Sequence, residues 1–234
     1  MSETTARCFG VLPAAGSGSR MGETTPKQYL NIAGASVLEH SLNALLKGDR
    51  FVAVSVPLAE DDHRARQIAL LSDSRVRLTQ GAAQRSGSVL AGLEALAGEA
   101  AEQDWVVVHD AARPCLLATD RDRLIETVCD SGVGGLLAEP IADTVKQVDA
   151  QRRVSATLDR SLLWRAQSPQ MFRYGELKRA LLAAESAGTP VTDEASAMEA
   201  AGYPVQIVPS SSENLKITWA ADLSLAGWYL ERRQ

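Results

Sequence analysis

The stretch that decides the fold reads Cys8-Phe9-Gly10-Val11-Leu12-Pro13-Ala14-Ala15-Gly16-Ser17-Gly18-Ser19-Arg20-Met21-Gly22, with Pro26-Lys27-Gln28 shortly after it. Its first five residues form an apolar run, which predicts a buried strand. Gly16 and Gly18 then allow the backbone to turn and to bring N–H groups close to an anion. Arg20 and Lys27 place two cations just beyond that turn. The stretch therefore predicts a strand that ends in a cradle for a polyphosphate.

Two commoner phosphate-binding motifs do not fit this stretch. A dinucleotide fingerprint needs G-x-G-x-x-G and an acid about 20 residues later, at the end of a second strand. Here Met21 holds the sixth position, and Glu39 lies in a segment with helical apolar spacing. A Walker loop needs Gly-Lys followed by Ser or Thr, and no such run follows. The alternative is a plain tight turn, and the cations Arg20 and Lys27 favour phosphate over it.

The bulk composition is that of an ordinary globular protein. The chain has 234 residues, of which 45% are hydrophobic and 23% charged. This length lies within the range of one α/β domain, so we expect a single domain over residues 1–234. The net charge of −5 argues against a general nucleic-acid binder, which would be basic.

Cysteines, histidines and termini give no sign of a metal site or a membrane anchor. The three cysteines are odd in number, widely spaced and flanked by apolar residues, so we expect reduced core thiols. The three histidines show no metal-ligand spacing. Residues 1–7 are polar, and no apolar run approaches the length of a membrane span. We therefore expect a cytoplasmic protein without a membrane partner.

Strand-like runs alternate with helical patterns along the rest of the chain, which predicts a layered α/β sheet. The expected strands cover residues 8–12, 51–56, 76–79, 105–108, 134–138 and 205–208. The expected helices cover residues 37–46, 62–71, 86–97, 174–187, 192–201 and 222–232, with one more around 124–129 that ends near Gly132.

Residues 139–160 interrupt this alternation. Two strand-like runs, Val145–Val148 and Val154–Leu158, flank the turn residues Asp149-Ala150-Gln151. The second run alternates apolar and polar residues, which gives it one apolar face. Because an isolated hairpin is marginal in water, that face should be buried against something. Its own domain and a partner subunit are the two alternatives.

Two further clusters carry polar residues that could bind a ligand. Asp110 and Arg113 follow the buried run Trp105–Val108, and ligands of open α/β sheets bind beyond the carboxyl ends of strands. Asp110 could hold Mg²⁺ or a sugar hydroxyl, or it could be a loop or N-cap aspartate. Arg113 could pair with Asp110 or with a phosphate. His109 is expected to be a packed, hydrogen-bonded histidine and not a catalyst.

The segment Gly81–Ser88 lies between a strand and the start of a helix, where free N–H groups favour anions. Ser86 and Ser88 could reach a nucleotide, or they could cap the helix. Lys216 lies in the otherwise apolar stretch 215–218 and is either a third cation of the site or a solvated surface lysine.

With these clusters in this order, the sequence resembles the 2-C-methyl-D-erythritol 4-phosphate cytidylyltransferase family of non-mevalonate isoprenoid synthesis. The resemblance spans nearly the whole chain. It rests on Ala14-Ala15-Gly16-x-Gly18-x-Arg20-Met21, Pro26-Lys27-Gln28-Tyr29, Arg85-x-x-Ser88-Val89, His109-Asp110-Ala111-Ala112-Arg113-Pro114, Asp143-Thr144-Val145-Lys146, Leu163-Trp164-x-x-Gln167-x-Pro169-Gln170, Thr192-Asp193-Glu194-Ala195-Ser196 and Glu213-Asn214-x-Lys216-x-Thr218.

The resemblance implies a Rossmann-like, mostly parallel sheet flanked by helices, of nucleotidyltransferase type, with a protruding β-hairpin arm. It implies transfer of the cytidylyl group of CTP to 2-C-methyl-D-erythritol 4-phosphate, with Mg²⁺ as cofactor. The implied catalytic residues are Arg20, Lys27 and Lys216. The implied CTP-binding residues are Ala14, Ala15, Gly16, Ser17, Gly18, Gly81, Arg85 and Ser88. The implied residues for the second substrate are Asp110, Arg113, Thr144, Arg160, Ser168 and Lys216, with Asp110 also placing the metal, directly or indirectly.

The arm, residues 139–160, embraces the other subunit of a homodimer in this family, so the resemblance favours the partner subunit over the arm's own domain. Ala82 and Ala83 stand where some members carry glycine and an acid that faces cytosine, which removes one side-chain contact to the base. Ser168 replaces a threonine and keeps the hydroxyl.

The substrate phosphate is already anionic at neutral pH, so attack on the α-phosphorus of CTP requires no strong general base. Two rival functions remain at this point. One is cytidylyl transfer to another polyol phosphate such as ribitol 5-phosphate, and the other is nucleotide binding without turnover.

Overall fold

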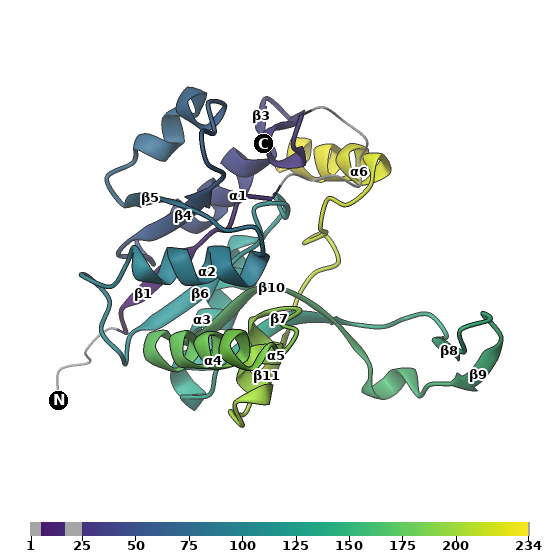
Figure 1. Cartoon of the computed structure of the whole chain (residues 1–234). Coiled ribbons are helices and arrows are strands. Elements are labelled where there is room, and N and C mark those ends of the chain that lie inside the picture. The colour runs from purple at the N-terminus through teal and green to yellow at the C-terminus, as the bar shows by residue number, and fades with distance from the viewer. Residues whose placement is uncertain (1–5, 17–24, 234) are drawn as a thin grey trace.

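A seven-stranded sheet forms the centre of the molecule, with helices on both of its faces (Figure 1). The computed structural model describes residues 6–16 and 25–233. The strands are β1 (Cys8–Val11), β4 (Val54–Leu58), β5 (Val76–Gln80), β6 (Trp105–Val108), β7 (Gly135–Pro140), β10 (Trp164–Arg173) and β11 (Gln206–Pro209). Their order is β11-β7-β10-β6-β1-β4-β5, and β10 runs antiparallel to both of its neighbours. The other adjacent pairs are parallel, so the prediction of a mostly parallel sheet is confirmed.

The helices are α1 (Val37–Leu46), α2 (Arg85–Glu94), α3 (Ala118–Ser131), α4 (Tyr174–Ala187), α5 (Glu194–Ala200) and α6 (Ala220–Glu231). α1 and α3 bury their apolar sides against one face of the sheet, and α2, α4 and α5 cover the other. α6 packs over a smaller cluster beside the short hairpin of β2 (Asn31–Ile32) and β3 (Ala35–Ser36).

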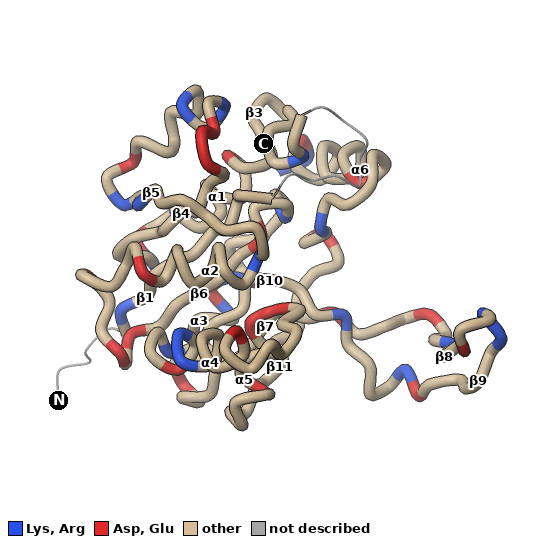
Figure 2. Tube along the Cα trace, viewed as in Figure 1, with Lys and Arg blue, Asp and Glu red and all other residues tan. Residues whose placement is uncertain are grey.

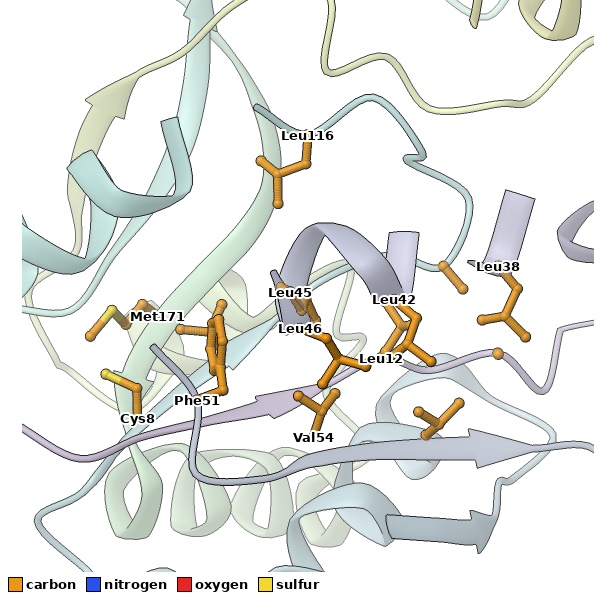
Figure 3. Packing of buried hydrophobic residues seen from close by; sticks show 14 of the residues in the cluster. Cys8, Leu12, Leu38, Leu42, Leu45, Leu46, Phe51, Val54, Leu116 and Met171 are labelled. Carbon is orange, nitrogen blue, oxygen red and sulfur yellow. The ribbon is translucent and has the colours of Figure 1, made fainter. Parts of the chain in front are cut away.

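The apolar face of α1, with Leu38, Leu42 and Leu45, shows how the sequence specifies this packing (Figure 3). The Ser36 hydroxyl accepts a hydrogen bond from the Glu39 amide, and the Glu39 carboxylate accepts one from the Ser36 amide, so a capping box begins the helix. Leu38, Leu42 and Leu45 recur at helical spacing and are fully buried against the sheet. A fully buried leucine stabilises the fold by about 1.5–3 kcal/mol, so this face alone fixes α1 on β1 and β4.

The observed elements differ from the predicted ones at residues 62–71, at residues 51–56 and at β10. Residues 62–71 form two 3₁₀ turns, η3 (Ala65–Gln67) and η4 (Ala69–Ser72), where a helix was predicted. The buried residues Ala65, Ile68 and Leu71 are spaced by three, which also suits a 3₁₀ turn with three residues per turn. The strand predicted over 51–56 is assigned to β4, which begins at Val54. β10 was not predicted.

The arm is a two-stranded hairpin that projects away from the sheet (Figure 1). β8 (Lys146–Val148) pairs antiparallel with β9 (Val154–Thr157) at its tip, and η5 (Arg160–Leu162) follows. Val154 is 61% exposed and Leu158 is 38% exposed, so the predicted apolar face is open in a single chain. The alternative in which the apolar face packs on its own domain is therefore wrong. Figure 2 shows that acidic and basic residues are interspersed along the arm.

Within the described ranges, no helix combines the length and apolar character needed to cross a membrane.

Candidate active site

Two adjoining cavities lie at the carboxyl ends of β1, β5 and β6. The larger has a volume of about 340 Å³ and the smaller about 180 Å³. The larger is lined by the loop after β1, the loop before α2, the segment after β6 and the stretch 216–218. The smaller is lined by residues of β10, by Arg113 and by the segment before α5. Arg85, Asp110 and Lys216 line both cavities, so these three side chains form the boundary between them.

The described part of the predicted polyphosphate cradle, Ala14 to Gly16, lines the larger cavity. The Ala14 amide donates a hydrogen bond to Pro57 O at 2.8 Å, which continues the β1–β4 pairing past the strand end. Gln28, a buried residue, donates from Nε2 to Ala14 O and Gly16 O, both at 2.9 Å. The 3₁₀ turn η2 (Lys27–Tyr29) thereby fixes the entrance of the cradle. Sequence reasoning assigned no role to this glutamine.

Lys27 reaches the same cavity from η2. Its Nζ donates to Ile217 O at 2.9 Å, which ties it to the segment that carries Lys216. The remaining predicted cradle residues, Ser17, Gly18 and Arg20, lie outside the described residues.

The loop before α2 forms the opposite wall. The Ser88 hydroxyl accepts a hydrogen bond from the Ala82 amide at 2.9 Å, and Ala82 O and Gln84 O lie 3.1 and 3.2 Å from it. A Cβ added at Gly81 would lie only 2.5 Å from the Ala15 Cβ, so glycine allows this loop to approach the cradle closely. Ser88 thus organises the backbone of the wall from a buried position.

Asp110 is the centre of the charged boundary. Its Oδ1 accepts from Arg85 Nε at 3.0 Å, and its Oδ2 lies 2.8 Å from Lys216 Nζ and 3.6 Å from Arg113 Nε. Burial alone would raise the pKa of this carboxyl, but the cations Arg85, Lys216 and Arg113 hold the pKa well below its usual range. Asp110 is therefore an ionised carboxylate under all ordinary conditions.

Glu194 lies behind this boundary and was missed as a site residue. It is fully buried at the start of α5, and its two oxygens accept from Arg85 Nη1 at 2.6 Å and Nη2 at 3.0 Å. Burial opposes the charge of Arg85, yet Glu194 and Asp110 together raise the pKa of its guanidinium. The sequence signal that could have indicated this residue is a carboxylate beside small residues in the run Asp193-Glu194-Ala195-Ser196.

His109 is a packed, hydrogen-bonded residue, as predicted. Its Nε2 lies 3.0 Å from Arg113 O and its Nδ1 lies 3.1 Å from Ser168 Oγ, while the Asp110 amide donates to the same hydroxyl at 2.9 Å. One assignment satisfies all three contacts: Nε2–H donates to the carbonyl, and Ser168 donates to Nδ1. Burial lowers the pKa of His109 to about 4, so the ring is neutral. The Ser168 hydroxyl thus forms its hydrogen bonds with protein groups, although the residue lines the smaller cavity.

The far wall of the smaller cavity is a network of buried polar side chains. Arg113 donates from Nη1 to Asn214 O at 2.6 Å. The side-chain Nδ2 of Asn214 donates to Ser168 O at 2.7 Å and to Gln167 Oε1 at 2.8 Å. Gln170 donates to Asp193 and accepts from the Ala195 amide. This network fixes the arginine and the start of α5 relative to β10.

Thr144 and Arg160 stand apart from the other predicted substrate residues. Both are exposed on the arm and line neither cavity. Arg160 Nη1 donates to Ala142 O at 2.5 Å, a contact within the arm itself. Within one chain the structure therefore does not bring these two residues to the cavities.

The described residues hold no group of three or more histidine, cysteine, aspartate or glutamate side chains arranged to bind a metal ion. Asp110 is the carboxylate that lines both cavities, and both of its oxygens already contact cations. Mg²⁺ commonly binds through one or two carboxylates plus substrate phosphates. The residues present thus fit a magnesium ion carried mainly by a triphosphate, with Asp110 in an indirect role.

Comparison with known proteins points to one family. The family model described as 2-C-methyl-D-erythritol 4-phosphate cytidylyltransferase matches residues 8–232. Curated proteins with that name from Ectopseudomonas mendocina and from Azoarcus sp. are each 50% identical to the chain, over 92% and 97% of it and over 92% and 95% of their own lengths.

Solved structures agree with these relatives. The crystal structure of the Francisella tularensis 2-C-methyl-D-erythritol 4-phosphate cytidylyltransferase is 33% identical, with a TM-score of 0.82 over 96% of this chain and 100% of that one. A crystal structure of 4-diphosphocytidyl-2C-methyl-D-erythritol synthase is 35% identical, also with a TM-score of 0.82, over 96% of this chain and 99% of that one.

Proposed function

The chain belongs to the 2-C-methyl-D-erythritol 4-phosphate cytidylyltransferase family, and we propose that its two adjoining cavities hold the two substrates of that reaction. The enzyme transfers the cytidylyl group of CTP to 2-C-methyl-D-erythritol 4-phosphate, which gives 4-diphosphocytidyl-2-C-methyl-D-erythritol and pyrophosphate. What remains to be proposed is the place of each substrate and the way the residues act.

One observation carries the assignment of the cavities. Arg85, Asp110 and Lys216 line both, so a group bound in one cavity meets a group bound in the other at these side chains. The larger cavity lies between the polyphosphate cradle and the loop organised by Ser88, which suits CTP. The smaller has Arg113 and the polar side chains of β10, which suit a phosphorylated polyol. The α-phosphorus of CTP and the attacking phosphate oxygen would then meet at the boundary.

The transfer would proceed in line and without a general base. An anionic phosphate oxygen of the polyol forms a bond to the α-phosphorus, and the bond from that phosphorus to the oxygen bridging the β-phosphate breaks. Pyrophosphate leaves with the electron pair. No proton must be removed from the nucleophile, so positioning and charge stabilisation supply the rate enhancement.

Cations near the boundary would stabilise the charge that develops in this transition state. Lys27 and Lys216 both line the larger cavity, and the Lys27 Nζ bond to Ile217 O holds the two lysines on neighbouring segments. Arg20, outside the described residues, keeps its predicted role beside them. Fixed cations in a partly dry site stabilise developing charge more strongly than the same groups in water.

Asp110 and Arg113 would orient the acceptor substrate. The Asp110 carboxylate can accept a hydrogen bond from a polyol hydroxyl, and the Arg113 guanidinium can donate to its phosphate. Ser168 would contribute through the wall that it forms with His109, because its hydroxyl already bonds within the protein.

Mg²⁺ is the proposed cofactor. When bound with CTP, the ion neutralises charge on the triphosphate and on the departing pyrophosphate. Asp110 would assist by fixing the cations Arg85 and Lys216 next to the phosphates.

The arm is proposed to complete the acceptor site of a second copy of the chain, with the rest of the chain acting as one nucleotidyltransferase domain. Thr144 and Arg160 are exposed on the arm and line neither cavity of their own chain, while apolar residues of the hairpin are exposed. A homodimer in which each arm embraces its neighbour would bury that apolar surface and bring both residues to a site. The cytoplasm remains the proposed location.

Pyrophosphate release from CTP tests the assignment of substrates. Release should depend on Mg²⁺ and on 2-C-methyl-D-erythritol 4-phosphate, and ribitol 5-phosphate should support it poorly. Comparable rates with both polyols would contradict the proposed fit of the smaller cavity. Asp110→Asn should weaken the response of the rate to Mg²⁺ more than it lowers the melting temperature. An unchanged response would return Asp110 to a structural role.

A further inference from the structure

We propose that Glu194, which lines neither cavity, is a positioning residue for cytidylyl transfer. It holds the Arg85 guanidinium from behind, so that Asp110 keeps one oxygen for Lys216. The inference rests on the roles proposed above for Asp110 and Lys216.

The Glu194–Arg85 contact has the geometry of a fixed support. The two terminal nitrogens of Arg85 face the two oxygens of Glu194 at 2.6 and 3.0 Å. Such two-point pairs of arginine and carboxylate are both strong and directional. Arg85 is the first residue of α2 and Glu194 the first residue of α5, so the pair joins a wall of the nucleotide cavity to a wall of the acceptor cavity.

This support decides how the oxygens of Asp110 are shared. Nη1 of Arg85 is directed at Glu194, and Nη2 lies between Glu194 Oε2 and Asp110 Oδ1, at 3.0 and 2.9 Å. Together with Nε, at 3.0 Å, Nη2 holds Oδ1 of Asp110 and leaves Oδ2 free of Arg85. Oδ2 is then available to Lys216, whose Nζ lies 2.8 Å away. Without the carboxylate of Glu194, the guanidinium could turn both terminal nitrogens onto Asp110 and occupy both oxygens. Lys216, 42% exposed, would lose the contact that holds it at the boundary.

Charge gives the expected kinetic signature. Arg85, Arg113 and Lys216 surround two carboxylates, so the cluster as it stands has an excess of one positive charge. Removing the charge of Glu194 raises that excess, which favours the binding of anionic substrates in the ground state. The same change displaces the cations from the positions that serve the transition state. Glu194→Gln should therefore lower kcat without raising the KM of either substrate.

A purely structural role would look different. Glu194 begins α5, and the adjacent residues Thr192 and Asp193 line the acceptor cavity. If Glu194 only fixed that helix, its loss would loosen the cavity wall. The KM for the polyol phosphate would then rise, and the melting temperature would fall in proportion.

The first experiment measures kcat and both KM values for the full chain and three variants. Glu194→Gln should lower kcat by about tenfold or more while both KM values change by less than about threefold. Glu194→Asp keeps the charge and should recover part of kcat. Glu94→Gln is the matched control, because Glu94 on α2 pairs with Lys178 at 2.6 Å on the surface, and its kcat should stay within about twofold of the parent. A raised KM with unchanged kcat for Glu194→Gln would overturn the proposal.

A second experiment covers the case in which Glu194→Gln folds poorly, since removing one partner of a buried ion pair can destabilise a protein strongly. Arg85→Met is compared with Arg85→Met combined with Glu194→Gln, which removes both charges. If Glu194 acts through Arg85, the second substitution causes no further loss of kcat in this background. A further loss as large as in the parent would overturn the proposal.

Lys216→Met separates this inference from the proposed function. If Lys216→Met keeps the parent kcat, the role proposed for Lys216 is wrong and the inference fails with it. If Lys216→Met loses activity while Glu194→Gln keeps it, the inference alone is wrong.

Discussion

Residues predicted to bind the acceptor substrate lie in two regions, the charged boundary between the cavities and the arm. The charged groups are paired around one buried carboxylate in the first region and exposed in the second. Asp110 is buried and contacts three cations, of which Arg85 is also held by Glu194 and Arg113 by the Asn214 carbonyl. Arg160 is exposed, and its Nη1 donates to Ala142 O, at the other end of the same arm in sequence. A charged group in the first region is fixed before any ligand arrives, whereas a group in the second depends on whatever the arm contacts.

This difference indicates which parts of the site a single chain can form alone. The described part of the cradle, the Ser88 loop and the charged boundary belong to one chain. Hydrogen bonds between distant segments join Gln28 to Ala14, Arg85 to Asp110 and Lys27 to Ile217. Among the described residues, Arg160 donates only to Ala142 O within the arm, and neither it nor Thr144 lines either cavity, so we expect their function to depend on a second chain. Four predictions test this contrast.

Substitution in the fixed region should have the largest effect. Lys27→Ala should lower turnover at saturating CTP by about a hundredfold, which corresponds to about 3 kcal/mol of lost transition-state stabilisation. The melting temperature should change little, because Lys27 lies on the cavity wall and not in an apolar cluster. Steady-state kinetics and thermal unfolding measure both quantities. A variant with a near-normal rate would remove Lys27 from the set of transition-state cations.

Burial of His109 should make the fixed region sensitive to acid. The pKa of His109 is lowered by burial from 6.5 to about 4, so between these pH values the unfolded chain binds a proton that the folded chain does not. Stability contributed by the neutral ring is thus present above pH 6.5 and lost as the pH falls toward 4, by about 3 kcal/mol in total. In His109→Gln, urea unfolding should show a correspondingly smaller loss between pH 7 and pH 4. Equal losses in both proteins would show that His109 is not the group responsible.

Mixed dimers test whether the arm serves another chain. Lys27→Ala and Arg160→Ala should each inactivate their own homodimer. If the arm serves the neighbour, one site of a mixed dimer carries both lesions and the other carries none. Random pairing of equal amounts in a twofold dimer should then restore about a quarter of the parent activity.

The same mixture gives a clear contrary outcome. If Arg160 serves its own chain, each site of the mixed dimer carries one lesion, and the mixture shows only the sum of the residual rates. Mass spectrometry of the intact dimers would confirm that mixed pairs are present in the sample.

The smallest effect on the stability of the chain itself is expected on the arm. Val154 is 61% exposed, so Val154→Asp should change the stability of one chain by no more than about 0.5 kcal/mol. It should nevertheless favour the monomer, because the substitution places a charge on the proposed interface. Light scattering measures the mass, and a stable, fully active dimer would locate the interface elsewhere.

Sequence patterns predicted the elements whose burial follows a simple period. Val37–Leu46 is a helix with the predicted bounds, because its leucines recur at helical spacing and Ser36 and Glu39 cap it. Trp105–Val108 is a strand with the predicted bounds, because all four residues are apolar and both faces are covered.

β10 escaped prediction for a physical reason. Gln167, Ser168 and Gln170 are nearly as inaccessible as the apolar core, although polar residues are usually exposed. They are satisfied by partners far away in sequence, such as Asn214 and the start of α5, and no local pattern encodes those partners. The same reason hid Glu194, whose role depends on an arginine 109 residues away.

The central position of β1 has a consequence for how the chain folds as it is synthesised. β1 is made before its neighbour β6: one edge of β1 pairs with Trp105–Val108, and β6 in turn pairs with Phe172 and its neighbours in β10. An emerging chain must therefore carry an apolar strand with an open edge until about a hundred further residues have been made. The charged boundary, which includes Lys216, forms later still. Such late, long-range pairing slows folding and exposes strand edges to aggregation. We therefore expect the growing chain to be most prone to aggregation before residue 173 has left the ribosome.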